Sequence, residues 1–207
     1  MIAAATGPIP TAIGVLALVA PSISVTAPLP QPSSPAGLSQ PVVSTLNAVT
    51  GVVTANAGIV PAGDGGDIEV FASHDTDLVI DVNGYFAAPG EGGLSLYPAA
   101  PCRVLDTSRG NGAFSGELTV DVVDSICAPP STAQAYVLNT TVVPSVPLGY
   151  LTHWLDGSQQ PLASTLNSVD GTTTSNMAIV PTNNGQIDAY ATDLTQLIVD
   201  ISGYFAP

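Results

Sequence analysis

The chain has almost no positive charge. Among its 207 residues the only cations are Arg103 and Arg109, against 16 aspartate and glutamate residues, and the formal net charge is −14 at pH 7. Nucleic-acid binding needs a basic surface that neutralises phosphates, and anionic membranes likewise attract basic residues. The sequence therefore predicts neither a nucleic-acid partner nor binding to an anionic membrane surface.

Charge of either sign is scarce, and so are the features of helical and membrane-spanning proteins. Only 9% of the residues are charged, whereas 20 glycines and 19 prolines are spread through the chain. The apolar run Ile13 to Ala20 is far too short to span a bilayer, and prolines bracket it. We therefore expect strands and turns, no membrane span, and a largely uncharged surface that suits self-association.

Cysteine is limited to two residues, Cys102 and Cys127. An even count in a chain rich in Thr, Ser, Asn and Gly fits an oxidising compartment, so we predict a disulfide and an extracellular or cell-surface location. The bridge would close a loop of about 26 residues and stabilise the fold by about 3 to 3.5 kcal/mol. The alternative is a pair of buried free thiols. The cysteines lack the CxxC or histidine spacing of a metal site, so no metal is predicted.

Catalytic motifs are missing as well. No serine lies in a GxSxG elbow, and the sequence contains neither an HExxH motif nor a P-loop. The histidines, His74 and His153, do not occupy equivalent positions in the repeat described below. The sequence therefore predicts no catalytic residue, no enzyme activity and no cofactor.

The main feature present is an internal repeat. The segment Gln40 to Pro61 returns 120 residues later as Gln160 to Pro181, with 13 of 22 positions identical. The segment Gly66 to Phe86 returns 119 residues later as Gly185 to Phe205, with 9 of 21 positions identical. Similarity at a nearly fixed offset identifies a repeated structural unit.

Each copy predicts the same series of short strands, separated by turn signals rich in Gly, Asn and Asp. Their spacing of about ten residues, without a helical period, is typical of a β-sandwich or barrel. We therefore predict an all-β fold with two tandem sandwich-like repeats. The predicted strands are Val42 to Asn47, Val52 to Val60, Ile68 to Ala72, Leu78 to Val82, Leu162 to Asn167, Thr172 to Val180, Ile187 to Ala191 and Gln196 to Ile201.

The two copies are unequal. Both cysteines and both arginines lie in Tyr97 to Pro130, and this segment has no counterpart before the first copy. The sequence thus predicts an incomplete first repeat over residues 1–86, a linker over 87–96, and a complete second repeat over 97–207 whose disulfide segment is 97–130. Offsetting by 120 residues matches the run Ile13 to Ala20 with Ala133 to Thr140, which predicts a core strand in the first repeat.

Several runs resemble a repeat domain that occurs, often in tandem, in secreted and surface proteins of bacteria. They are YPAAPCRVLDTSRG at Tyr97 to Gly110, STLN, IVP and the closing DVNGYF or DISGYF. The resemblance implies an extracellular β-rich repeat without catalytic residues. The first copy lacks the PCRVLDT portion.

Polar residues in and near these runs are predicted to be structural. Arg103 and Asp106 lie three residues apart, and we expect an ion pair in preference to a substrate clamp, with Asp81 or Asp200 as alternative partners for the guanidinium. Asp81 and Asp200 close equivalent strands, and we expect each, as a buried carboxylate, to accept backbone or hydroxyl hydrogen bonds in preference to acting as a catalytic pair. The asparagines at equivalent positions of the two copies are also predicted to be structural; they are Asn47 with Asn167 and Asn56 with Asn176.

Three further sites are weaker candidates. Acidic residues near His74 suggest calcium ligands, but they match no known calcium loop, so solvated loops are the preferred interpretation; these residues are Asp64, Asp67, Asp75 and Asp77. An aromatic sugar-binding platform at Tyr150, His153 and Trp154 is an alternative to a half-buried strand. Asn139 begins a glycosylation sequon, which is a short and weak pattern.

The function that these observations favour is structural. An incomplete β repeat exposes unpaired backbone groups that a strand from another chain can satisfy, and a contact that does not close produces a fibre. We therefore expect an extracellular subunit that assembles with copies of itself into a filament or lattice. The alternative is a carbohydrate-binding or adhesive module of a surface protein, with glycans as its partners.

Overall fold

The computed structural model describes residues 12–19, 23–26, 45–60, 68–87, 90–110 and 112–207. The predicted all-β fold is confirmed: twelve strands are accompanied by a single 3-10 turn, η1 (Thr107–Arg109), within these residues. The chain divides into two compact units, unit 1 over residues 1–93 and unit 2 over residues 94–207. The division falls inside the segment predicted as a linker. The described part of the chain holds no helix long and apolar enough to cross a membrane.

Unit 2 contains a seven-stranded antiparallel sheet. Its strands are β6 (Ser95–Asp106), β7 (Phe114–Asp121), β8 (Ala135–Pro144), β9 (Leu148–Leu155), β10 (Leu166–Ser168), β11 (Thr174–Pro181) and β12 (Gln186–Ala206). The predicted strand over Leu162 to Asn167 is therefore shorter and begins later than expected.

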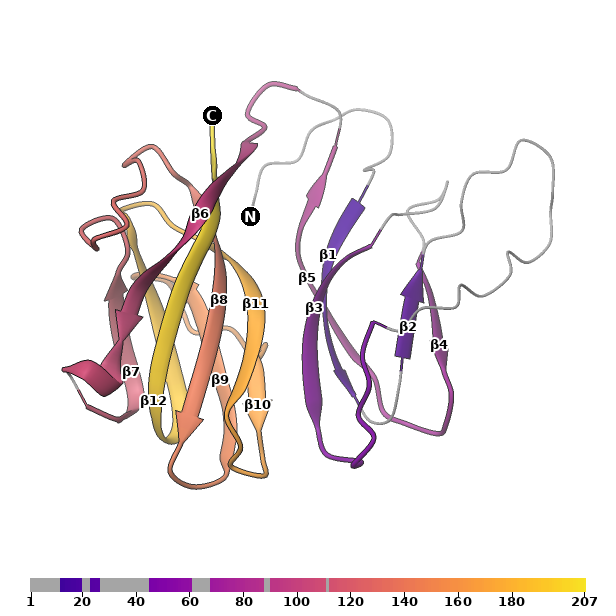
Figure 1. Cartoon of the computed structure of the whole chain (residues 1–207). Helices are drawn as coiled ribbons and strands as arrows, with labels where there is room; N and C mark the ends of the chain where they lie inside the picture. The colour runs from indigo at the N-terminus through magenta and orange to yellow at the C-terminus, as the bar shows by residue number, and fades with distance from the viewer. Residues whose placement is uncertain (1–11, 20–22, 27–44, 61–67, 88–89, 111) are drawn as a thin grey trace, which may run out of the picture. The chain divides into compact units, whose positions relative to one another are not determined.

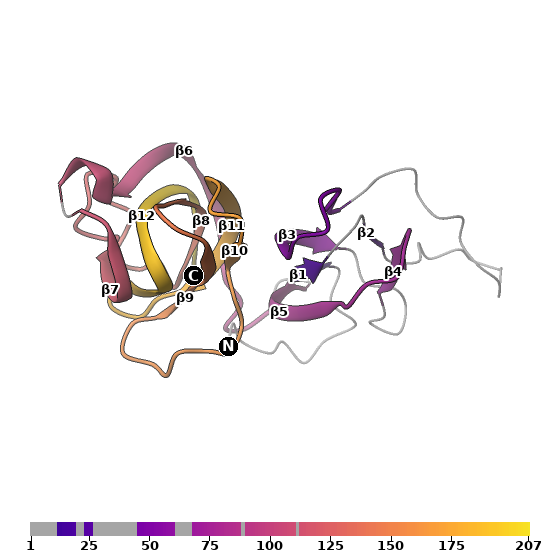
Figure 2. The same cartoon turned by 90° about the horizontal axis from the view of Figure 1, so that it is seen from below.

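The long strand β12 organises unit 2. Its first half pairs with β7 on one side and β9 on the other, and its second half pairs with β6 and β8. β10 then extends the sheet beyond β9, and β11 extends it beyond β8. The sheet curves until it is nearly closed (Figure 2). The sequence predicted two strands here, and the structure joins them across a register shift between Ala191 and Thr195.

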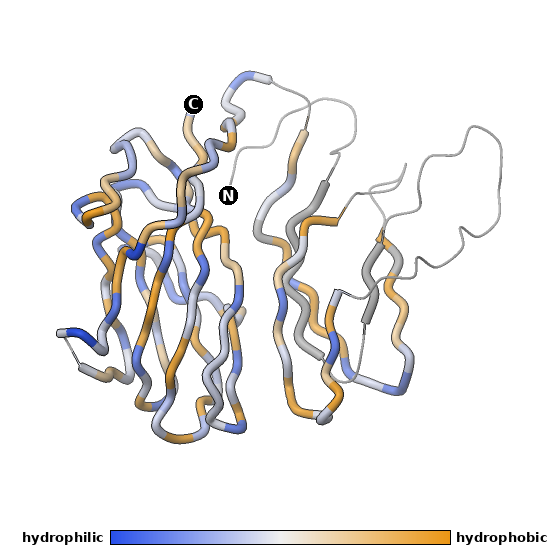
Figure 3. The backbone as a smooth tube through the Cα atoms, viewed as in Figure 1, coloured by the Kyte–Doolittle hydropathy of each residue, from blue (hydrophilic) through white to orange (hydrophobic). Residues whose placement is uncertain are grey.

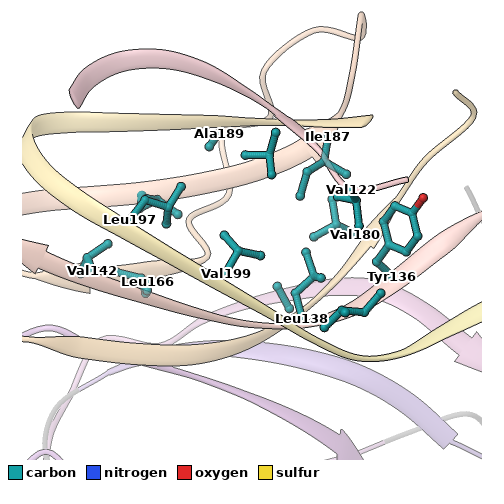
Figure 4. Packing of buried hydrophobic residues seen from close by; sticks show 14 of the residues in the cluster. Val122, Tyr136, Leu138, Val142, Leu166, Val180, Ile187, Ala189, Leu197 and Val199 are labelled. Atoms are coloured by element: carbon teal, nitrogen blue, oxygen red, sulfur yellow. The ribbon is translucent and has the colours of Figure 1, made fainter. Parts of the chain in front are cut away.

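The core of unit 2 lies inside this curved sheet. Along β12, buried and half-buried residues alternate, so that Leu197, Val199 and Ile201 all face the interior. Figure 3 shows the same alternation of hydrophobic and hydrophilic positions along several strands. Figure 4 shows the aliphatic side chains of this core gathered in one cluster, with Val180 and Leu138 near Tyr136, whose side chain is fully buried. Each large apolar side chain in such a core contributes about 1.5 to 3 kcal/mol.

Unit 1 has five described strands in two sheets. A three-stranded sheet has the order β3-β1-β5, and a separate pair joins β2 and β4 (Figure 1). The predicted strand near Ile13 is confirmed as the middle strand of the larger sheet. The strands are β1 (Ala12–Val19), β2 (Ile23–Thr26), β3 (Thr54–Val60), β4 (Glu69–Ala72) and β5 (Val79–Phe86). The predicted strand at Val42 to Asn47 lies partly outside the described residues.

The sheet β3-β1-β5 has the same register as β11-β8-β12 of unit 2. In unit 1, Ile13 lies opposite Val60 and Tyr85. In unit 2, Tyr136 lies opposite the repeat-equivalent residues of β11 and β12. Both sheets also carry a register shift at the same place, after Val82 in β5 and after Ile201 in β12.

This register corrects one detail of the sequence alignment. A constant offset of 120 residues matched Ile13 with Ala133, whereas the strand pairing matches it with Tyr136. The first copy therefore differs by three residues in the connection that follows β1. The prediction of two tandem sandwich-like repeats, the first of them incomplete, stays a prediction, because the described strands of unit 1 form two separate sheets.

Candidate functional site: the open strand edge of unit 1

In unit 2, the strand β6 covers the second half of β12. Arg103 lies opposite Asp200, and Cys102 lies opposite Ile201. The predicted disulfide is confirmed: it joins Cys102 in β6 to Cys127, and their Cα atoms are 5.7 Å apart. The bridge therefore ties β6 covalently to its own unit.

Ion pairs hold β6 in the same place. The Nε and Nη2 atoms of Arg103 donate to the two carboxylate oxygens of Asp200, and the Nη2–Oδ2 distance is 3.3 Å. The predicted ion pair is also present, with 3.0 Å between Nη1 of Arg103 and Oδ2 of Asp106. Arg109 binds the same oxygen of Asp106 at 3.1 Å. Both arginines of the chain are therefore paired within unit 2.

Asp106 has a further role at the end of β6. Its Oδ1 atom accepts hydrogen bonds from the hydroxyl and the backbone N–H of Ser108, and so caps the turn η1. The hydroxyl of Ser108 is the main reason why the pKa of Asp106 lies below its ordinary value, and the two arginines lower it further. The hydrogen bond to Asp200 likewise raises the pKa of Arg103. Both shifts favour the charged forms of Asp106 and Arg103.

Unit 1 contains no described counterpart of β6. β5 takes the place of the second half of β12, and the described strands pair with only one of its edges. We call the backbone from Val79 to Gly84, on the side away from β1, the open edge of β5. β4 is equivalent to part of the first half of β12, the half that pairs with β7 in unit 2. The only described partner of β4 is β2, so the described part of unit 1 also contains no counterpart of β7.

Side chains along β5 are exposed where those of β12 are buried. Val82 is 62% exposed, whereas Ile201, its equivalent, is 2% exposed. Leu78, just before β5, is 37% exposed, whereas Leu197 is fully buried. Because the two sheets share their register, this difference reflects the strands that surround β12 and have no described counterpart around β5.

The sequence of β5 also lacks the prolines that protect an ordinary sheet edge. β6 is itself an edge strand, but it carries Pro98 and Pro101, which lack the N–H group that a further strand would need. β5 contains no proline, and its only charged residue is Asp81. Such an edge is a template for pairing with another chain.

Asp81 occupies the position of Asp200 in unit 2. Both carboxylates are only half-buried, so the prediction that they are buried at strand ends is wrong. Asp200 accepts hydrogen bonds from Arg103, which was one of the expected alternatives. Asp81 has no ion pair with any described residue, because both arginines are bound to carboxylates of unit 2.

The equivalent asparagines make equivalent hydrogen bonds. The side-chain amide of Asn176 donates to the backbone oxygen of Thr165 at 2.8 Å, and that of Asn56 donates to Thr45 at 2.5 Å. Asn176 is buried. These asparagines fix the segment that precedes β3 or β11. In the other pair, Asn167 donates to the oxygen of Gly149, and Asn47 is exposed.

Replacing Asn176 by alanine should lower the free energy of unfolding of unit 2 by about 1 to 3 kcal/mol, because the backbone oxygen of Thr165 loses its buried donor. Urea unfolding followed by the fluorescence of Trp154, the only tryptophan, measures this change. The control is Asn139→Ala, since Asn139 is exposed and should tolerate the change within about 0.5 kcal/mol. Equal losses in the two variants would contradict a structural role for Asn176.

The structure contradicts the candidate sugar-binding platform. His153 and Trp154 in β9 are 7% and 5% exposed, and the indole N–H donates to the backbone oxygen of Ser158. The segment before β10 covers the outer face of β9, as shown by the 2.6 Å hydrogen bond from Thr152 Oγ1 to the oxygen of Ala163. Tyr150 instead packs against the ring of Tyr190. The structure therefore buries His153 and Trp154 within unit 2 and leaves only Tyr150 of the three half-exposed.

The remaining candidates gain no ligand site from the structure. Asp64 and Asp67 lie outside the described residues, and Asp75 and Asp77 are exposed. No group of three or more potential metal ligands occurs among the residues that the structure describes. Asn139 lies exposed on β8, and its amide is 3.5 Å from the hydroxyl of Thr141.

Fold and site together define an all-β protein with one disulfide-linked, nearly closed unit and one unit with an open strand edge. Comparison of the chain with models of protein families, with curated proteins and with solved structures gives no match. The resemblance to a bacterial surface repeat therefore stays a prediction. What the open edge can do has to be inferred from its own geometry.

Proposed function

We propose that the chain is a structural subunit that assembles with copies of itself into a filament or lattice, by adding a strand of one subunit to unit 1 of the next. The observation that carries this proposal is the open edge of β5, which stands where unit 2 has the disulfide-linked strand β6. Backbone N–H and C=O groups along such an edge, together with the exposed side chains of Val79 and Val82, gain partners when a strand is added.

The chemistry of the surface supports the same proposal. A low content of charged residues removes much of the desolvation that opposes close contact between subunits, and the contact has to overcome only the like-charge repulsion of its sparse acidic residues. A contact in which unit 1 of one copy accepts a segment from elsewhere in the next copy is heterologous, and such contacts form open fibres unless the rotation closes. The disulfide supports an oxidising location, outside the cell or at its surface.

Electron microscopy and size-exclusion chromatography of the purified full chain test this function. We expect extended assemblies from the unchanged protein and monomers from the double variant Val79→Lys, Val82→Lys, because lysines on an edge strand oppose strand pairing. The matched control is Val143→Lys, Val146→Lys, which alters two exposed valines of unit 2 by the same charge. A stable monomer at high protein concentration, or equal loss of assembly in both double variants, would refute the proposal.

A further inference from the structure

Unit 2 shows which strand the open edge of β5 is built to receive. β6 places Arg103 opposite Asp200 and Cys102 opposite Ile201. Since β5 repeats the register of β12, the same strand placed against β5 would bring its arginine to Asp81 and the residue before that arginine towards Val82. Asp81 is therefore the position at which this edge can distinguish one incoming strand from another by charge.

The chain itself has no cation to offer at this position. Its only lysine or arginine residues are Arg103 and Arg109. Both are bound to carboxylates of unit 2, and the disulfide ties β6 to the segment that follows β7 in the same unit. A strand donated by another copy therefore leaves Asp81 without a cation, whereas a strand from a different polypeptide can supply one.

We propose that unit 1 binds an extended strand of another polypeptide that carries arginine or lysine opposite Asp81, and that this cation forms with Asp81 the ion pair that Arg103 forms with Asp200 in unit 2. This inference rests on the proposed addition of a strand to unit 1. In a head-to-tail assembly the last copy at one end keeps an unfilled unit 1. The cationic strand would bind there and so attach or cap the end of the assembly.

A peptide with the sequence of β6 is a direct probe. The peptide spans residues 95–106 and carries Cys102→Ser to prevent disulfide exchange, and its binding to the full-length chain is measured by fluorescence anisotropy. A second peptide carries Arg103→Gln in addition. We expect the arginine peptide to bind about threefold to tenfold more tightly, as for a partly exposed ion pair on a sheet. This preference should weaken as salt is raised.

Two variants of the chain locate the binding site. In Asp81→Asn the preference for the arginine peptide should disappear, because the incoming guanidinium finds no charged partner. In Asp200→Asn, the matched control, the preference should remain, because that position is already covered by β6 of the same chain. Loss of the preference in Asp200→Asn instead would mean that the peptide displaces β6, and would overturn the proposal.

A cross-link tests the register independently of affinity. A peptide that retains Cys102 should form a disulfide with Val82→Cys under mild oxidation, because the equivalent residues Cys102 and Ile201 lie opposite each other in unit 2. Val79→Cys should cross-link poorly, since its equivalent, Ile198, lies opposite Asp106. Equal cross-linking of both variants would contradict the predicted register.

Failure of this inference differs from failure of the proposed function. Assembly of the unchanged protein together with equal binding of the two peptides, or no binding of either, would overturn the cationic strand and leave self-assembly standing. A monomeric protein that binds the arginine peptide through Asp81 would support the cationic strand and refute self-assembly.

Discussion

Removing the disulfide is expected to lower the free energy of unfolding of unit 2 by about 3 kcal/mol, because the unfolded chain regains the freedom of a loop closed over 25 residues. The variant is Cys102→Ser, Cys127→Ser. β6 would then be held against β12 by its backbone pairing, by the stacked rings of Tyr97 and Tyr204 and by the partly exposed ion pairs of Arg103. Urea unfolding followed by the fluorescence of Trp154 measures the loss.

Reduction provides the matched control for this prediction. The unchanged protein treated with dithiothreitol should unfold at the same urea concentration as the double serine variant, and the serine variant, which has no cysteine, should not respond to the reagent. If the oxidised protein and the serine variant unfolded at the same urea concentration, the disulfide would contribute nothing to the free energy of unfolding. The proposed surface location would then lose the stability argument that the disulfide supplies.

Much of the fold was predictable, because the strands have a local alternating pattern and the sequence repeat shows which segments of the two copies are equivalent. Strands such as β3 and β11 follow from short apolar runs between turn signals, and the repeat places them in pairs. The continuity of β12 was not predictable, because the polar residues around Asp193 resemble a turn. In the structure Asp193 accepts a hydrogen bond from Gly149 N at 3.2 Å, so a neighbouring strand stabilises the bend. A contact of this kind between strands cannot be predicted from the sequence around Asp193 alone.

The candidate site was predictable in part. The missing PCRVLDT portion indicated an incomplete first copy, and the spacing of Arg103 and Asp106 indicated an ion pair. The sequence did not show that β6 pairs with β12, so Asp200 could not be selected as the main partner of Arg103 from several carboxylates. The sugar platform failed for a similar reason, because alternation along β9 does not reveal that the segment before β10 covers its outer face.

Acid is expected to destabilise unit 2 through the buried side chain of His153. Nδ1 of this histidine lies 3.2 Å from the backbone oxygen of Asp188, which can only accept, so Nδ1 carries the hydrogen. Nε2 is buried and finds no hydrogen-bond partner among the described residues. Burial lowers the pKa of His153 to about 4, although the contact with Asp188 opposes this shift.

The sign of the pH dependence follows from this shift. The unfolded chain binds a proton at about pH 6.5, which the folded chain does not bind until about pH 4. The free energy of unfolding therefore falls as the pH is lowered through this window, by about 3 kcal/mol in total. Hydrogen bonds lower the pKa of three carboxyl groups of unit 2 below their usual value, so their contributions are lost only at still lower pH; they are Asp106, Asp170 and Asp193.

Unfolding in urea at pH 4, 5, 6 and 7, followed by Trp154 fluorescence, measures this effect. His153→Asn keeps a donor for the oxygen of Asp188 but has no group that titrates between pH 4 and 6.5, so the slope of stability against pH in this window should largely vanish. The variant His74→Asn changes the other, exposed histidine and should keep the slope of the unchanged protein. If His153→Asn retained the full slope, another group would be responsible, and neutral burial of His153 would not explain the acid sensitivity of this β unit.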